Sequence, residues 1–209
     1  MDLIEYKYLQ LCKDESSDES LDIFEHLPTL CRYATECETI LETGVRGCVS
    51  SWALTLGLLK NNKPIKKLYL NDIVPCNIQS LLNVTDKLDI NVYYLWKNNL
   101  DIQMTENVDM VFIDTWHVYG QLKRELAKFS KVTNKYIIMH DTTVDEIYGE
   151  TIRCGWDARQ QSIKSGIPIE EILCGLGKAI DEFLNTNKNW ILLEKYTNNN
   201  GLTVLKRIG

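Results

Sequence analysis

The sequence predicts an α/β fold whose mostly parallel, doubly wound sheet has seven strands and ends in an antiparallel hairpin. Three observations predict it: short apolar runs alternate with longer amphipathic stretches, the apolar runs have the length of strands, and the last two flank an Asn-Gly step. The 209 residues, 44% hydrophobic and 25% charged, are enough for a single domain, residues 1–209, with a buried core.

The N-terminal segment, residues 1–38, is predicted to be helical. Residues 14–20 read DESSDES, a polar and acidic patch that is typical of a loop or a helix start. Ser20 or Asp22 is expected to cap a helix that continues to about Cys37.

Runs of β-branched, aromatic and other apolar residues predict the strands. The first five are Thr39–Thr43, Lys67–Asp72, Asn91–Trp96, Asp109–Asp114 and Lys135–His140. The hairpin strands are Asn189–Tyr196 and Leu202–Ile208. Residues 142–174 contain no clean strand, and we expect this insertion to form a lid or acceptor-binding segment over the carboxyl edge of the sheet.

Composition disfavours several functions. No apolar stretch approaches the roughly 18 residues of a membrane span. A net charge of -6 and scattered basic residues give no footprint for nucleic-acid phosphates. Seven cysteines without a Cys-x-x-Cys pair suit a reducing compartment. We expect a cytoplasmic protein without membrane or nucleic-acid partners. Whether it forms a homodimer is left open by the sequence.

The first predicted strand leads into a glycine turn and a helix start. Gly44 allows a sharp turn in which backbone N–H groups can approach a ligand, and Ser50 and Ser51 can cap the helix. Arg46 stands where a dinucleotide fingerprint needs its second glycine, which disfavours NAD and FAD. Glu42 could accept hydrogen bonds from the ammonium group of an amino-acid-bearing cofactor. The alternative is a turn that merely connects strand and helix.

This turn resembles the first motif of class I S-adenosylmethionine-dependent methyltransferases, in the form E-x-G-x-x-x-G-x-S. Glu42, Gly44 and Ser50 match, and Cys48 takes the place of the second glycine. The resemblance implies a Rossmann-like fold and S-adenosylmethionine as cofactor, bound by a turn that includes Arg46.

Further residues are candidates for binding the nucleoside part of that cofactor. Asp72 ends the second strand, where a carboxylate can accept both ribose hydroxyls. A helix cap or a solvated carboxylate is the alternative for Asp72. Asn98 or Asn99 lies where methyltransferases often contact adenine.

The strongest cluster combines the ends of the fourth and fifth strands. Asp114 and Asp141 are expected to converge there, with His117 three residues beyond the first carboxylate and His140 beside the second. Oxygen ligands suit Mg²⁺ or a similar divalent cation better than zinc. The alternatives are strand-end carboxylates bonded to helix N-termini, and an inner histidine in place of a ligand at His140.

The stretch Phe112–Tyr119 is similar to F-L-D-H-W-K-x-x-Y of catechol O-methyltransferases. That similarity places Asp114 and Asp141 at the two metal aspartates, His117 on the catalytic lysine and Thr142 where an asparagine usually completes the metal site. The I-D-x-x-H-x-Y and H-D motifs resemble equally the cephalosporin hydroxylase-like and methyltransferase-24-like group, which implies sugar hydroxyls among the acceptors.

The predicted function is a metal-assisted O-methyltransferase that acts on a small hydroxylated acceptor such as a sugar or a phenol. His117 is the expected base. The acceptor pocket has four aromatic candidates, for which simple packing is the alternative: Trp116, Tyr119, Tyr148 and Trp156.

Two other functions stay open. An NAD(P)-dependent oxidoreductase is weakened by Arg46 and by the lack of a clear Tyr-x-x-x-Lys pair. The departures at Cys48 and Thr142 would permit a non-catalytic nucleoside-binding relative.

Overall fold

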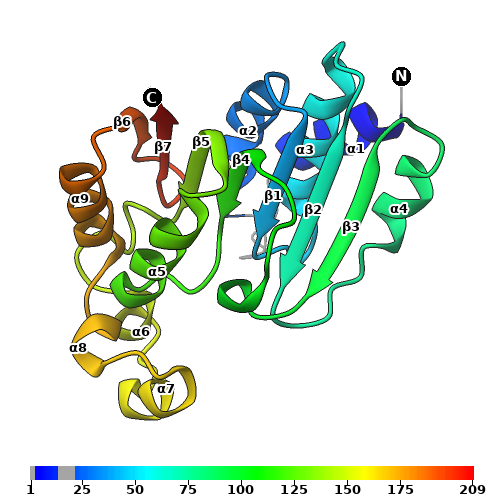
Figure 1. Ribbon diagram of the computed structural model, residues 1–209. Coiled ribbons are helices and arrows are strands. Elements are labelled where there is room, and N and C mark those ends of the chain that lie inside the picture. The colour runs from blue at the N-terminus through cyan, green and yellow to red at the C-terminus, as the bar shows by residue number, and fades with distance from the viewer. Residues whose placement is uncertain (1–2, 14–21) are drawn as a thin grey trace. The chain divides into compact units, whose positions relative to one another are not determined.

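The computed structural model describes residues 3–13 and 22–209, and Figure 1 shows their helices and strands. Within these residues the strands number seven, in the order β3-β2-β1-β4-β5-β7-β6. The predicted Rossmann-like sheet with its C-terminal hairpin is therefore confirmed. The chain divides into two compact units, Met1–Ile113 and Asp114–Gly209. The acidic segment 14–20, including the candidate cap Ser20, lies outside the described residues.

The first unit contains four parallel strands in the order β3-β2-β1-β4. They are β1 (Thr39–Thr43), β2 (Lys67–Asp72), β3 (Asn91–Trp96) and β4 (Val108–Ile113). All residues of β1 and β4 are buried, which explains their unbroken apolar character. The chain order reverses between β1 and β4, and open sheets bind ligands at the carboxyl ends of strands on either side of such a reversal.

The observed bounds of β1, β2 and β3 match the predicted ones. β4 begins and ends one residue before its predicted range, so Asp114 directly follows the strand.

Helices α1, α2 and α3 pack on one another, and Figure 1 shows them together behind β1 and β2. The helical segments are α1 (Leu3–Cys12), the 3-10 helix Phe24–His26, α2 (Leu27–Ala34), α3 (Val49–Lys60), α4 (Gln79–Thr85) and the 3-10 helix Asn99–Asp101. The expected single helix to Cys37 is wrong, because the 3-10 turn precedes a new helix with Pro28 in its first turn. Asp22 caps neither of them, since their N-caps are Ile23 and His26.

Helix α3 is buried from Ser50 to Leu58, so it forms the centre of this helical layer. Gly57 lies against α2, where a Cβ atom at position 57 would overlap the Ala34 side chain and the Cys31 carbonyl oxygen. The close approach of the two helices therefore depends on the missing side chain.

The second unit contains the antiparallel strands β5 (Thr133–His140), β6 (Trp190–Tyr196) and β7 (Leu202–Arg207). β7 lies between the other two and pairs with both. Asn199, Asn200 and Gly201 have φ angles of 45°, 69° and 96°, as the Asn-Gly step predicted for a tight hairpin turn. Helix α5 (Tyr119–Phe129) packs against α9 (Leu176–Thr186).

Residues 142–174 contain no strand, as predicted. They form three short helices, α6 (Glu150–Arg153), α7 (Ala158–Ser165) and α8 (Ile169–Ile172). A small apolar cluster of Val118, Ile167 and Ile172 anchors the segment beside α5. Among the residues described, no helix has both the length and the apolar surface that crossing a membrane requires.

We expect Gly57→Ala to lower the free energy of unfolding by about 1–3 kcal/mol, because the added methyl group forces α2 and α3 apart. This loss is the net effect, because the clash with the Cys31 carbonyl oxygen costs more than the gain of about 1 kcal/mol in helix propensity. Urea unfolding of both proteins measures the difference. Gly47→Ala is the matched control, since a Cβ atom there meets only Val49 Cγ2, at 4.0 Å. A Gly57→Ala protein as stable as the parent would contradict this packing.

Candidate active site

The turn after β1 is a loop of unusual backbone conformation. Gly44, Arg46 and Cys48 have φ angles of 88°, 42° and 61°, and such angles are rare for residues with side chains. The Gly44 N–H donates to the Asn71 carbonyl at 2.9 Å. Arg46 is exposed, and its guanidinium lies 3.6 Å from Asp22.

Glu42 lies fully buried beneath this turn. One of its carboxylate oxygens accepts a hydrogen bond from Ser50, and the other accepts one from Ser51 at 2.6 Å. The expected capping role of these serines is wrong, because the N-cap of α3 is Cys48 and the two hydroxyls pair with the buried carboxylate. A buried charge needs such donors more than a helix end does.

Asp72 holds the turn in place. Its Oδ2 accepts the N–H groups of Val45 and Arg46, both at 3.0 Å, and its Oδ1 accepts the N–H of Val74 at 2.9 Å. The candidate ribose ligand is thus also the anchor of the glycine turn.

The two candidate adenine residues have different environments. Asn98 Oδ1 accepts the Leu100 N–H at 2.9 Å and so caps the 3-10 helix. Asn99 is buried.

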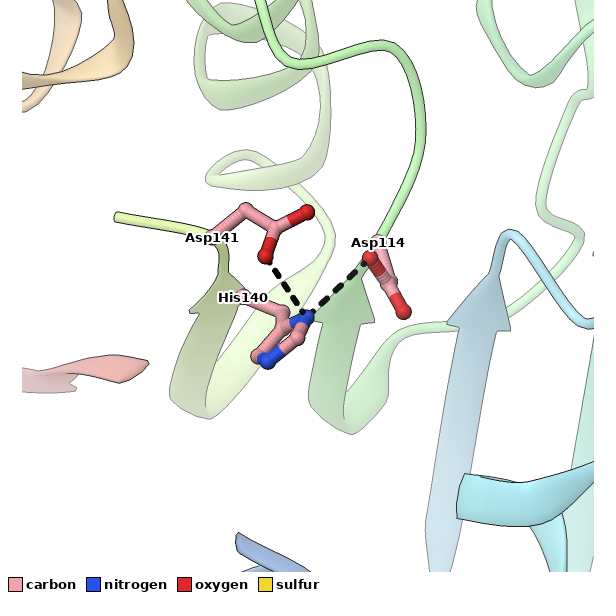
Figure 2. A group of neighbouring side chains, drawn as sticks. All are labelled: Asp114, His140 and Asp141. Atoms are coloured by element: carbon pink, nitrogen blue, oxygen red, sulfur yellow. Dashed lines mark ion pairs between the residues drawn. The ribbon is translucent and has the colours of Figure 1, made fainter. Parts of the chain in front are cut away.

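The second unit brings together the four predicted residues of the metal and base cluster. His117 Nε2 lies 3.1 Å from Asp114 Oδ1, and His117 Nδ1 lies 2.9 Å from Asp141 Oδ2. His140 Nδ1 lies 3.5 Å from Asp114 Oδ1 and 3.4 Å from Asp141 Oδ1, as Figure 2 shows. Two carboxylates and two imidazoles therefore alternate around a ring. We call these four residues the acid-histidine ring.

Opposite charges dominate the electrostatics of the acid-histidine ring. Burial raises the pKa of the Asp114 carboxyl, but His140 and His117 outweigh burial and hold that pKa well below its usual range. Burial lowers the pKa of His117, yet Asp114 and Asp141 outweigh it and raise that pKa well above the ordinary value. The pKa of Asp141 is lowered and that of His140 is raised by the same attractions, against burial. The two carboxylates therefore favour the protonated form of each histidine.

Three residues near this ring were missed by the sequence reasoning. Asp145 is fully buried, lies 3.6 Å from His117 Nδ1 and forms two hydrogen bonds, of 2.8 and 2.7 Å, with the Arg153 guanidinium. Glu150 Oε2 lies 3.5 Å from His117 Nδ1 and accepts the His117 backbone N–H at 3.3 Å. Nothing in the sequence distinguishes these acids from solvated ones.

The donor set of the acid-histidine ring fits a divalent cation. Single atoms of Asp114, His140 and Asp141 lie within 4.8 Å of one another. His140 Nε2 faces the Asn199 carbonyl at 3.1 Å and must donate to it, which leaves Nδ1 as the ligand atom. In the described part of the chain, Asp141 Oδ1 is buried and accepts no hydrogen bond. Asp141 also has a φ of 58°, a strained conformation that is common at functional sites.

Thr142, the fourth candidate ligand, is buried next to β7. Its hydroxyl accepts a hydrogen bond from the Thr203 hydroxyl at 2.8 Å. Thr142 therefore remains a candidate ligand only through its second lone pair.

Comparisons with known proteins identify the fold. No family model matches the chain, and no curated protein matches it. Among solved structures, the N-methyltransferase NodS from Bradyrhizobium japonicum WM9 has a TM-score of 0.57 at 13% identity, over 92% of this chain and 99% of that one. The O-methyltransferase TomG from Streptomyces achromogenes, solved with S-adenosylmethionine, has a TM-score of 0.56 at 14% identity, over 100% and 91%.

A third structure is the Podospora anserina methyltransferase PaMTH1, bound to S-adenosylhomocysteine. Its TM-score is 0.55 at 14% identity, over 99% of this chain and 88% of that one. The chain therefore has the fold of class I S-adenosylmethionine-dependent methyltransferases.

We expect Cys48 to resist modification by a thiol reagent at pH 8. Burial, followed by the charge of Glu42, raises the pKa of the Cys48 thiol to about 12, so only about one molecule in 10,000 carries the reactive thiolate. Peptide mapping after timed labelling measures each cysteine separately, with the exposed Cys154 as the control. Equal labelling rates at both positions would show that the turn does not hold Cys48 as described.

Proposed function

We propose that the protein is an S-adenosylmethionine-dependent O-methyltransferase that uses a divalent cation and acts on a hydroxyl group of a small acceptor. The observation that carries the proposal is the acid-histidine ring, whose mostly buried oxygen and nitrogen atoms suit a cation. Its position at the carboxyl ends of β4 and β5 suits an active site of this fold. The methyl donor found in the TomG structure supports it.

The turn after β1 would hold the methyl donor. Asp72 fixes the turn by accepting the N–H groups of Val45 and Arg46, and the donor would lie against this turn and the Asp72 carboxylate. Next to Asp72, the side chains of Ile73, Val74 and Trp96 are 67%, 55% and 64% exposed. This apolar surface suits a purine ring, which gains from stacking. When bound, the donor supplies an electrophilic methyl group on a sulfonium centre.

The acid-histidine ring would receive and orient the acceptor hydroxyl. Asp114, Asp141 and His140 would hold the cation, whose chemistry is to lower the pKa of a neighbouring hydroxyl. In the transfer, the acceptor oxygen would form a bond to the methyl carbon while the carbon–sulfur bond breaks and leaves its electron pair on sulfur. The hydroxyl proton would pass to a ring residue. His117 in its neutral form is the proposed recipient, because its side chain is 12% exposed while that of His140 is fully buried.

A non-catalytic nucleoside-binding protein is the second candidate. The observation that favours it is Cys48, which occupies a left-handed position with a buried thiol where the related motif has a glycine. It predicts binding of the methyl donor without transfer to any acceptor.

We expect Asp114→Asn and Asp141→Asn each to lower the rate of methyl transfer roughly 100-fold or more, because each removes a carboxylate from the cation site. Radiolabelled methyl donor and a panel of catechol, 4-hydroxybenzoate and glucose report the rate, with and without Mg²⁺. Asp181→Asn, an exposed change in α9, is the control. Full activity of both variants would remove the acid-histidine ring from the reaction.

We expect Asp72→Asn to weaken binding of S-adenosylmethionine about tenfold, because a charged acceptor of backbone N–H groups becomes a neutral one. Titration calorimetry measures the dissociation constant. Asp86→Asn, at the exposed end of α4, should bind like the parent. Tight binding of NAD, with none of S-adenosylmethionine, would instead support the oxidoreductase alternative.

A further inference from the structure

A cavity of about 350 Å³ lies beside the acid-histidine ring within the second unit. Its lining residues are Trp116, Glu150, Trp156, Gln161 and Lys164. Glu150 connects the cavity to the ring, since its Oε2 lies 3.5 Å from His117 Nδ1. An occupant of the cavity therefore lies next to the proposed reacting groups. The volume is at the lower end of the range of ligand pockets and suits a molecule with one ring.

The walls of the cavity are mostly apolar, and two indole rings contribute to them. Trp116 packs against the Val118, Ile167 and Ile172 cluster, which fixes its ring. Its Nε1 is buried and makes no hydrogen bond within the described part of the chain, so one donor of this wall has no partner. Trp156 is 47% exposed, and such a large apolar ring gains from being covered.

Three of the five lining residues are polar, and two of these already have partners. Glu150 is already bonded to the His117 backbone, and Gln161 Oε1 accepts the Thr151 hydroxyl at 2.6 Å. Lys164 is exposed and, among the residues described, has no hydrogen-bond or ion-pair partner. Most hydroxyl groups of a sugar would stay in contact with solvent here and add little to its binding, because the wall is mostly apolar. An aromatic ring needs no polar partners and stacks on tryptophan.

We propose that this cavity selects an acceptor with a single aromatic ring and an anionic group, with Trp116 and Trp156 as the stacking surface and Lys164 as the counter-charge. The identity of the occupant as a methyl acceptor rests on the proposed function, whereas its binding needs no methyl donor. Of the two acceptor classes that the sequence left open, the aromatic one is therefore favoured over the sugar.

Three probes separate the contributions of ring and charge: 4-hydroxybenzoate, the neutral 4-hydroxybenzamide, and the anionic sugar glucuronate. Calorimetry on the full chain, without methyl donor, is expected to give the tightest binding for 4-hydroxybenzoate, by about tenfold. Lys164→Gln should weaken 4-hydroxybenzoate about fivefold and leave 4-hydroxybenzamide unchanged, because an exposed ion pair is worth a modest factor. Lys188→Gln, which changes an exposed lysine outside the cavity, should alter neither.

Trp156→Ala should weaken both aromatic probes about tenfold, and Trp156→Phe should restore most of that loss. Glucuronate binding as tight as that of 4-hydroxybenzoate would overturn the aromatic assignment, and an unchanged affinity in Lys164→Gln would overturn the role of the lysine. If 4-hydroxybenzoate binds as predicted but is never methylated, the proposed function fails while the cavity assignment stands. If a sugar is methylated and 4-hydroxybenzoate does not bind, the proposed function stands while the cavity assignment fails.

Discussion

One buried and one partly buried carboxylate, both of which require positive charge, organise the second unit. Asp114 and Asp141 are paired through His117 on one side and His140 on the other. Separate parts of the chain hold these histidines in place. The Asn199 carbonyl in the β6–β7 turn fixes the His140 ring, and Glu150 fixes the His117 backbone. The hairpin and the segment 142–174 therefore both contribute to the acid-histidine ring. A displacement of either segment would leave a charge of the ring without its partner.

The first unit solves a similar problem with neutral donors. Its buried Glu42 accepts hydrogen bonds from two serine hydroxyls. Asp72 accepts two backbone N–H groups of the turn after β1 and one from the residues that follow β2. These bonds keep the loop in a conformation that would otherwise be costly at Arg46 and Cys48. A turn held in advance loses less entropy when it binds a ligand, which is the physical advantage of such preorganisation.

Most of the fold could be predicted because each buried strand is a short, continuous apolar run. The carboxyl ends of parallel strands also lie at the same edge of the sheet, which places the residues that follow them close together. This reasoning found β1 to β3 without error and brought Asp114 and Asp141 together. It failed where long-range contacts decide. Ser50 and Ser51 could cap a helix locally, but the buried Glu42, eight residues earlier, takes their hydroxyls. Asp145 could not be identified as part of the site because only burial and Arg153 distinguish it from a solvated acid. Helices α6, α7 and α8 are too short for a periodic signal.

The central claim is that the acid-histidine ring binds a divalent cation, and manganese provides the most direct measurement because free Mn²⁺ has a strong electron paramagnetic resonance signal. Titration of the metal-stripped protein should show one bound Mn²⁺ per chain, with competition by Mg²⁺. His140→Gln, which removes the nitrogen ligand, should abolish that binding, while Lys188→Gln should retain it. Binding lowers the signal of free Mn²⁺. An equal fall of this signal with the parent and the His140→Gln protein, or no fall with either, would contradict the assignment of this site.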